Sequence, residues 1–159
     1  MRNLIIRRAS ADDVPAIGAL IGGLMSYLTL RPDGHGADKF KASMAPAALA
    51  RYVTEPAYHY LAGCIDGQLV GVAALRDRSH VFHLFVTPAC HRQGVARAMW
   101  SALLEAALAG PALAITVNAS RYAIGFYEGL GFAATEAIIE NLEHGIVYQP
   151  MALTLPRAE

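Results

Sequence analysis

The sequence predicts an α/β (α+β) fold: a mixed, mostly antiparallel sheet of about six to seven strands with helices on both faces. Three observations predict it. Short alternating apolar segments follow one another through tight turns in the middle of the chain, helical periodicity flanks them, and one connection between strands passes through a whole helix. A length of 159 residues suits a single domain, which we expect to span residues 1–159.

Composition limits the classes of function. Apolar residues make up 55% of the chain and charged residues 16%, which indicates a compact protein. The 13 basic and 13 acidic residues cancel, so we expect neither a nucleic-acid nor a membrane partner. No apolar run approaches the roughly 20 residues that span a bilayer, and we expect a cytoplasmic protein. Cys64 and Cys90 form no disulfide framework and are expected to be ordinary small, half-buried residues.

The first part of the chain predicts one strand and two helices. Residues 4–8 alternate as a strand does, and Ser10 with Asp12 and Asp13 marks the start of a helix that reaches residue 28. Its Gly22-Gly23 pair predicts a bend or a loosened turn. Residues 31–36 read as a loop, and a second helix is expected over 46–53.

The middle of the chain predicts an antiparallel meander. Residues 58–65 and 69–75 are apolar runs joined by Asp66-Gly67, which is the strongest hairpin signal in the sequence. A second turn at residues 77–79 leads into a central strand over 81–86.

The last part of the chain begins with a long helix from Val95, which Gly110-Pro111 closes. The strand over 113–117 should therefore lie parallel to the central strand, with a right-handed crossover. A helix over 122–130 and a final hairpin of strands 134–142 and 146–155 complete the chain. Pro150 inside the last strand predicts an edge position or a bulge.

The segment between the central strand and the long helix is suited to an anion. Gly94 allows the backbone to approach a bound group, and the first turn of the helix leaves N–H groups unpaired. With the helix dipole, Arg92 and Arg97, these N–H groups suit a diphosphate. A purely structural turn between strand and helix fits the same residues equally well.

Two further motifs decide between these interpretations. His91, Gly94 and Ala96 match an acyl-CoA loop written Q/R-x-x-G-x-G/A at its two small residues and depart from it at the first position. A second signature appears downstream, where the matching residues are Ser120, Ala123, Tyr127, Gly131 and Phe132, with Ser120 in place of the usual asparagine. Through these motifs the chain resembles the GNAT superfamily of acetyl-CoA-dependent N-acetyltransferases along nearly its whole length.

The resemblance implies a GNAT fold in which the two parallel central strands splay apart, and an N-acetyltransferase that uses acetyl-CoA as cosubstrate. The acceptor would be a primary amine of a small molecule or peptide that attacks the thioester directly in a ternary complex. A homodimer is left open. A non-catalytic acyl-CoA-binding or sensing domain of the same fold is the alternative. The residues expected to bind the cofactor are Phe85, Val86, Arg92, Gln93, Gly94, Val95, Ala96, Arg97, Asn118 and Ser120.

Two residues are expected to carry the proton transfers. Tyr127 matches the family's general acid, and its ordinary pKa of about 10 keeps it protonated near neutral pH; the alternative is a core tyrosine packed on the sheet. His83 lies on the central strand and is the candidate base for the amine, because histidine titrates nearest the working pH. A histidine merely hydrogen-bonded at the sheet face fits His83 equally well.

The remaining candidates concern the ends of the expected site. Asn118 is interpreted either as a helix cap or as a contact to the acetyl end. Tyr27, Phe40 and Tyr52 lie where the family usually builds its acceptor pocket, although a core role suits aromatic residues there too. No metal is expected, because the spacings of His80, His83 and His91 do not place the three side chains on one face.

Overall fold

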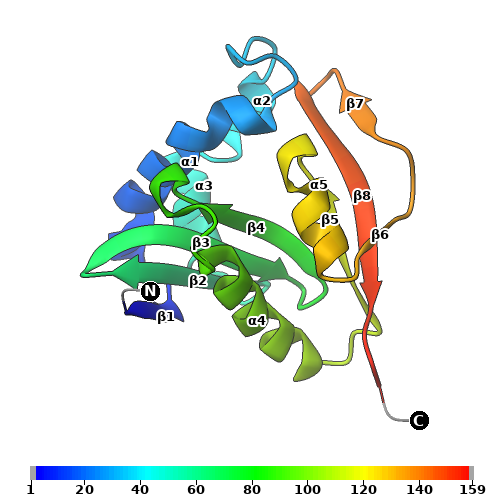
Figure 1. Cartoon of the computed structure of the whole chain (residues 1–159). Coiled ribbons are helices and arrows are strands. Elements are labelled where there is room, and N and C mark those ends of the chain that lie inside the picture. Colours follow the sequence, from blue (N-terminus) through cyan, green and yellow to red (C-terminus); the bar gives the residue numbers. More distant parts are fainter. Residues whose placement is uncertain (1–2, 158–159) are drawn as a thin grey trace.

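The computed structural model describes residues 3–157, and its centre is one eight-stranded mixed sheet (Figure 1). The strands follow the order β1-β2-β3-β4-β5-β8-β6, with β7 paired to β8. Only the β4–β5 pair is parallel within the described residues. The strands are β1 (Leu4–Arg8), β2 (Tyr58–Ile65), β3 (Gln68–Arg76), β4 (His80–Val86), β5 (Ala114–Ala119), β6 (Ala133–Ala134), β7 (Ile139–Asn141) and β8 (Ile146–Thr154).

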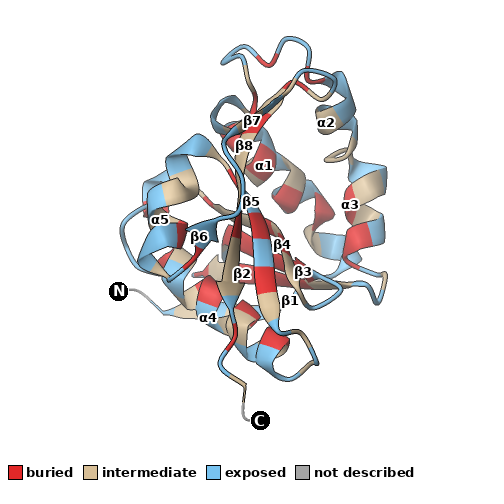
Figure 2. Cartoon of the chain, turned by 90° about the vertical axis from the view of Figure 1, so that its right-hand side faces the viewer, coloured by how far each residue is buried: buried red, intermediate tan, exposed pale blue. Residues whose placement is uncertain are grey.

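Helices cover both faces of this sheet and enclose two apolar cores, whose buried residues are red in Figure 2. One core lies under α1 (Val14–Leu28) and α3 (Pro46–Tyr52), and the other lies under α4 (Val95–Leu108) and α5 (Ile124–Gly129). The expected fold class is thereby confirmed. The described helices include none that is long and apolar enough to cross a bilayer.

The two tight turns of the meander have the backbone geometry that hairpins favour. Asp66 and Gly67 adopt φ values of 52° and 77°, and Asp77 and Arg78 adopt 53° and 56°. Two successive residues with positive φ form the turn whose twist matches that of the flanking strands. The predicted antiparallel order of β2, β3 and β4 is confirmed.

Several individual elements differ in detail from what the sequence predicts. A short helix, α2 (Asp38–Ala42), follows the 31–36 loop and has too few residues to show periodicity in the sequence. The Gly22-Gly23 pair does not interrupt α1, which runs unbroken to Leu28. The strand expected over 134–142 is split into β6 and β7. Pro150, expected at an edge or a bulge, lies inside β8 at the gap between the residues that pair with β7 and those that pair with β6.

Helix α4 packs unusually close to the sheet because two facing strand residues lack side chains. A Cβ atom at either Gly63 or Gly71 would lie 2.8 Å from Sδ of Met99, which is closer than real contacts allow. The far end of α4 is fixed by Arg157, whose guanidinium donates to the carbonyl oxygens of Ala107, Leu108, Gly110 and Ala112. A cation at this end also complements the helix dipole. The close approach of Met99 and the Arg157 hydrogen bonds together fix α4 against this face of the sheet.

The parallel strands β4 and β5 part from each other after a short stretch of pairing. The register pairs only His80 with Thr116 and Val81 with Val117, while β4 continues to Val86 and β5 to Ala119. The resemblance implied this splay. Beyond Val81, the side of β4 that faces β5 has no strand partner among the described residues.

Candidate active site

A cleft of about 1110 Å³ follows the splay between β4 and β5. It extends from the first turn of α4, past the ends of β4 and β5, to the segments around α1, α2 and α3. Of the expected site residues, those that line it are His83, Phe85, Val86, Arg92, Gly94, Ala96, Arg97, Asn118, Ser120 and Tyr127. Gln93 and Val95 do not line it: Gln93 donates to the carbonyl of Ala89, and the Val95 side chain is buried in the core.

The loop before α4 has the backbone geometry that suits an anion. Arg92 and Gly94 both have positive φ, 62° and 82°, and Gly94 is the N-cap of α4. A Cβ atom at Gly94 would meet nothing within 4 Å, so the space beside this backbone is open. The first N–H groups of an α-helix lack intrahelical acceptors, and here they face this space together with Arg92 and Arg97. Neither arginine forms an ion pair with any residue in the described range.

His91, which departs from the acyl-CoA loop motif, holds the loop against the end of β4. Its Nε2 donates to the carbonyl oxygen of Val86 over 2.7 Å. His91 thus has a hydrogen-bond partner within the protein at the position where the motif has glutamine or arginine.

The hydrogen-bond pattern of β4 determines which backbone groups face the splay. Thr87 N–H donates to the carbonyl of Val70 across the β3–β4 pair, and alternation then directs the backbone groups of Phe85 and His83 toward β3. The N–H groups of Leu84 and Val86 consequently point into the splay. Phe85 contributes its ring to the cleft wall.

Tyr127 projects into the cleft from α5, on the wall opposite β4. Its side chain is only 5% exposed and is packed edge-on against the rings of Phe126 and Phe132. Its hydroxyl makes no hydrogen bond to any described residue. The hydroxyl oxygen is nevertheless not a fully buried polar atom without a partner, because Tyr127 lines the cleft. Burial raises the pKa of Tyr127 well above its usual value of about 10, so the hydroxyl keeps its proton.

His83, on the β4 wall of the cleft, is enclosed by aromatic rings. Register shifts between Ala74 and Leu75 of β3, which leaves Phe82 without a pairing partner and places the Phe82 and His83 rings in a 4.3 Å stack. Nδ1 of His83 lies 2.7 Å from the hydroxyl oxygen of Tyr60. Burial lowers the pKa of His83 to about 3. This environment favours the hydrogen-bonded interpretation of His83, while its service as the base stays a prediction.

The three histidines that could have suggested a metal have separate partners. His80 bonds Oγ1 of Thr116, His83 bonds Tyr60, and His91 bonds the Val86 carbonyl. Among residues 3–157, no group of three or more His, Cys, Asp and Glu side chains is placed to hold a metal ion.

Asn118 and Ser120 lie at the end of β5, on the same wall as Tyr127. Neither side chain makes a hydrogen bond with a residue of the described chain, so the capping role considered for Asn118 is not seen. Both polar groups remain available to the cleft. Their expected contacts with a cofactor stay predictions.

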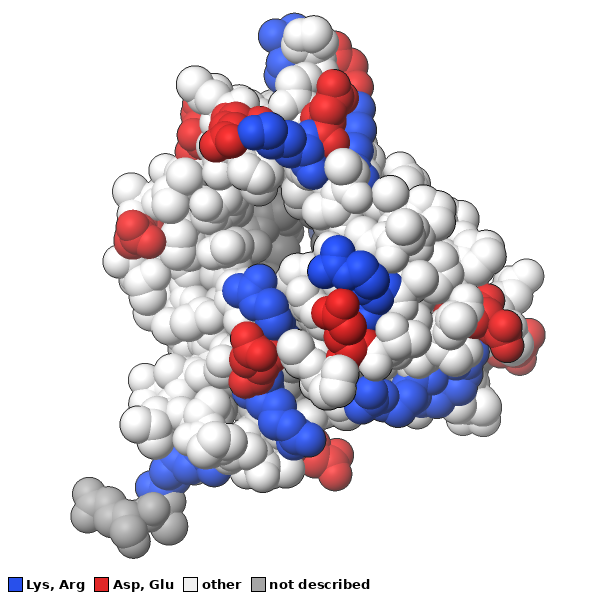
Figure 3. All heavy atoms as spheres, turned by 180° about the vertical axis from the view of Figure 1, so that it is seen from behind, with Lys and Arg blue, Asp and Glu red and all other residues white. Residues whose placement is uncertain are grey.

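The far end of the cleft is built largely from residues that the sequence did not single out. Tyr27, Phe40 and Tyr52 line it as the resemblance implied. They are joined by residues of α1, the segment after α2, β3, β7, the β7–β8 turn and β8: Leu24, Leu28, Ser43, Met44, Arg76, Asn141, His144, Ile146 and Tyr148. Only the tertiary fold brings β8 beside α1, through the isolated bridge between Thr29 and Ile146. Seen from behind, the molecule is hollowed on this face, and uncharged side chains border most of the hollow (Figure 3).

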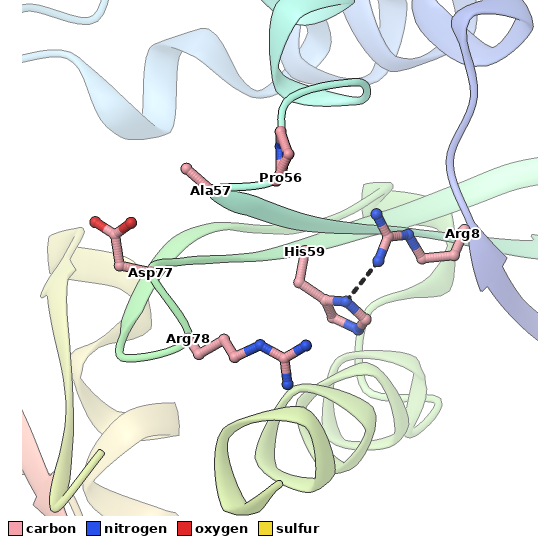
Figure 4. A pocket seen from close by; sticks show the side chains of 6 residues that line it. All are labelled: Arg8, Pro56, Ala57, His59, Asp77 and Arg78. Atoms are coloured by element: carbon pink, nitrogen blue, oxygen red, sulfur yellow. Dashed lines mark hydrogen bonds between the residues drawn. The ribbon is translucent and has the colours of Figure 1, made fainter. Parts of the chain in front are cut away.

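A second pocket, of about 340 Å³, lies outside this cleft and contains none of the expected site residues (Figure 4). Arg8 and His59 point toward each other in it, with 2.8 Å between a guanidinium nitrogen and Nδ1, while the Asp77 carboxylate points away. Burial, and then the charges of Arg8 and Arg78, lower the pKa of His59.

The comparisons with known proteins agree with this geometry. The sequence model of the acetyltransferase (GNAT) domain family matches residues 29–155. The protein therefore belongs to the GNAT acetyltransferase family. A search of curated protein sequences found no match.

Solved structures of the same fold cover nearly all of the chain. A GCN5-related N-acetyltransferase from Rhodopseudomonas palustris is 22% identical, with a TM-score of 0.80 and 98% of each chain covered. The PaiA N-acetyltransferase from Thermoplasma acidophilum, solved with coenzyme A, is 12% identical, with a TM-score of 0.76 and 96% of this chain and 99% of that one covered. The ribosomal-protein-S18-alanine N-acetyltransferase from Escherichia coli is 19% identical, with a TM-score of 0.71 and coverages of 99% and 97%. These likenesses confirm the fold.

Proposed function

We propose that this protein transfers the acetyl group of acetyl-CoA to a primary amine of a small molecule or peptide, by direct attack in a ternary complex. The observation that carries the proposal is the continuous cleft, which joins an anion-suited helix start to an aromatic pocket across the splay of β4 and β5. Acyl-CoA and amine could enter from its two ends and meet at the splay. Direct transfer needs this simultaneous access.

The cofactor would lie along β4 with its diphosphate on the first turn of α4. The N–H groups from Gly94 to Arg97 and the side chains of Arg92 and Arg97 offer donors and positive charge there. The unpaired N–H groups of Leu84 and Val86 can pair with the pantetheine arm and polarise the thioester carbonyl. Coenzyme A in the Thermoplasma acidophilum neighbour supports the choice of ligand.

Tyr127 would supply the proton that the departing thiolate needs. When the amine nitrogen forms its bond to the carbonyl carbon and the carbon–sulfur bond breaks, the sulfur carries the electron pair away and accepts the phenolic proton. Tyr127 suits this role because it lines the cleft, has no other hydrogen-bond partner in the described chain and holds its proton firmly in the free protein. The amine nitrogen loses one proton to solvent, and solvent returns a proton to the Tyr127 phenolate.

A thiol-release assay with acetyl-CoA and a panel of primary amines tests the proposal, together with calorimetric binding of coenzyme A. We expect coenzyme A to bind and at least one amine to be acetylated, with product mass increased by one acetyl group. Binding without acetylation of any amine would favour the acyl-CoA-sensing alternative instead.

A further inference from the structure

We infer that the acceptor is a weakly basic primary amine, such as the α-amine of an amino acid derivative, on an apolar or aromatic body that bears no second positive charge. The inference rests on the proposed acetyl transfer and concerns the acceptor end of the same cleft. It combines three features of that end: aromatic walls, the lack of an acidic side chain among the described residues that line it, and the presence of cations.

The walls of the acceptor end would bury an apolar body. Rings come from five different elements, and aliphatic side chains fill the space between them. The side chains concerned are Leu24, Tyr27, Leu28, Phe40, Met44, Tyr52, Phe82, Ile146 and Tyr148. Pockets of this kind bind chiefly by removing apolar surface from water, with a few polar groups to orient the ligand.

Among residues 3–157, no aspartate or glutamate lines the cleft anywhere along its length. Two acidic residues near the acceptor end form ion pairs and do not line the cleft: Glu143 with Lys39, and Glu55 with Arg51. A ligand with several ammonium groups would lose hydration on entry and find no carboxylate to replace it. Polyamines and lysine-rich segments are therefore poor matches to this end.

The charges that do reach the cleft are positive. Arg76 lines it and lies over the Phe82 ring, with 5.7 Å from the guanidinium carbon to the ring centroid. Its charge, after burial, also lowers the pKa of His80 at the same wall. The surroundings thus disfavour an added cation, and an amine is driven to enter in its neutral form.

The neutral form is scarce for alkylamines and common for α-amines. At pH 7.5 an amine with a pKa of about 10.4 is neutral in roughly one molecule in 800, whereas one with a pKa of about 8 is neutral in roughly one in four. With no carboxylate among the described residues that line it, and with His83 buried and held neutral, the cleft has little means to reverse this roughly 200-fold difference. Selection for weakly basic amines follows.

Three compounds test the inference: phenylalanine amide, phenethylamine, which keeps the ring but is an alkylamine, and spermidine, which has no ring and carries further ammonium groups. We expect kcat/KM at pH 7.5 to fall in that order, with phenylalanine amide at least tenfold above phenethylamine. The gap between the first two should narrow as the pH rises to 9.5. A kcat/KM for spermidine equal to or above that for phenylalanine amide would overturn the inference but leave acetyl transfer intact.

A variant that adds the missing charge makes the test independent of the compounds chosen. Met44→Glu should lower the KM for spermidine relative to phenylalanine amide by at least tenfold, with coenzyme A affinity unchanged. Leu142→Glu is the matched control, because Leu142 is 75% exposed and does not line the cleft. Equal effects of the two variants, in proteins with wild-type circular dichroism, would also overturn the inference. Failure of every amine in the panel would instead contradict the proposed function.

Discussion

The hydroxyl of Tyr60 lies 2.7 Å from Nδ1 of His83, and both side chains are buried on the α1 side of the sheet. This bond joins β2 to β4 across the intervening strand β3. It fixes the orientation of the His83 ring two residues after Val81, the last residue of β4 that pairs with β5.

Tyr60→Phe should destabilise the protein, because it leaves the buried Nδ1 of His83 without a hydrogen-bond partner. A cost of about 1–3 kcal/mol in the free energy of unfolding is the usual scale, and urea titration at pH 7.5 measures it. Tyr58→Phe is the matched control, since Tyr58 is in the same strand and its hydroxyl makes no hydrogen bond to a described residue. Equal losses in the free energy of unfolding in the two variants would show that the Tyr60–His83 hydrogen bond does not stabilise the fold.

Acid should weaken the fold through His83. The unfolded chain binds a proton at this residue near the ordinary pKa of about 6.5, while the folded protein, with its pKa lowered to about 3, resists it. The free energy of unfolding should therefore fall between pH 6.5 and 3, by up to about 1.4 kcal/mol for each pH unit from this residue. His83→Gln should flatten that part of the stability profile. An unchanged slope in the variant would contradict the lowered pKa.

Catalysis should show no ionisation of His83 near neutral pH. Because the folded-state pKa is about 3, the side chain stays neutral from pH 5 to 8, and kcat/KM of wild type and His83→Gln should share one profile shape there. The absolute rate of the variant can differ through packing. A limb near pH 6.5 that only the wild type shows would instead restore His83 as the base.

Gly94→Ala should weaken coenzyme A binding at least tenfold. The substitution places a methyl group in the open space beside the backbone and strains a residue with φ of 82°. Gly67→Ala controls for the strain, because Gly67 has φ of 77° and equally open surroundings in the β2–β3 turn, away from the cleft. Calorimetry that finds the same affinity in both variants would exclude the loop from the cofactor site.

Tyr127→Phe should lower kcat by about 10²-fold, the usual scale of general acid catalysis, and leave coenzyme A affinity unchanged. The raised pKa of Tyr127 further predicts no loss of rate through its ionisation below pH 10. Tyr122→Phe serves as control, since Tyr122 also lines the cleft but is 75% exposed. If the Tyr127→Phe variant has the wild-type kcat while chemistry is rate-limiting, Tyr127 is not the general acid and has only a structural role as a core residue.

Local patterns predicted the fold well wherever one short segment determines its own structure. Asp66-Gly67 predicted its hairpin because few other residue pairs accept two successive positive φ values. The break between β6 and β7 was missed because it depends on a distant residue: Pro150 has no N–H with which to continue a ladder across β8.

The candidate site divides in the same way. Gly94 and Tyr127 belong to motifs whose spacing is visible in the sequence, and both line the cleft. Arg76, Met44 and Tyr148 carry no such signal, since they become neighbours only when β8 closes against α1. The lowered pKa of His83 could not be foreseen either, because it comes from burial among rings of two strands and a helix.

The contact between β8 and the end of α1 also allows the opening of the acceptor end to be measured. The amide of Leu30 donates to the carbonyl of Gly145 over 2.7 Å, and this bond joins the loop after α1 to the β7–β8 turn. Deuterium can replace the Leu30 amide proton only when the two segments separate. Its exchange rate, followed by NMR with and without an amine, would therefore report how often the two segments separate. A slower rate with the amine would show that bound amine stabilises the closed wall.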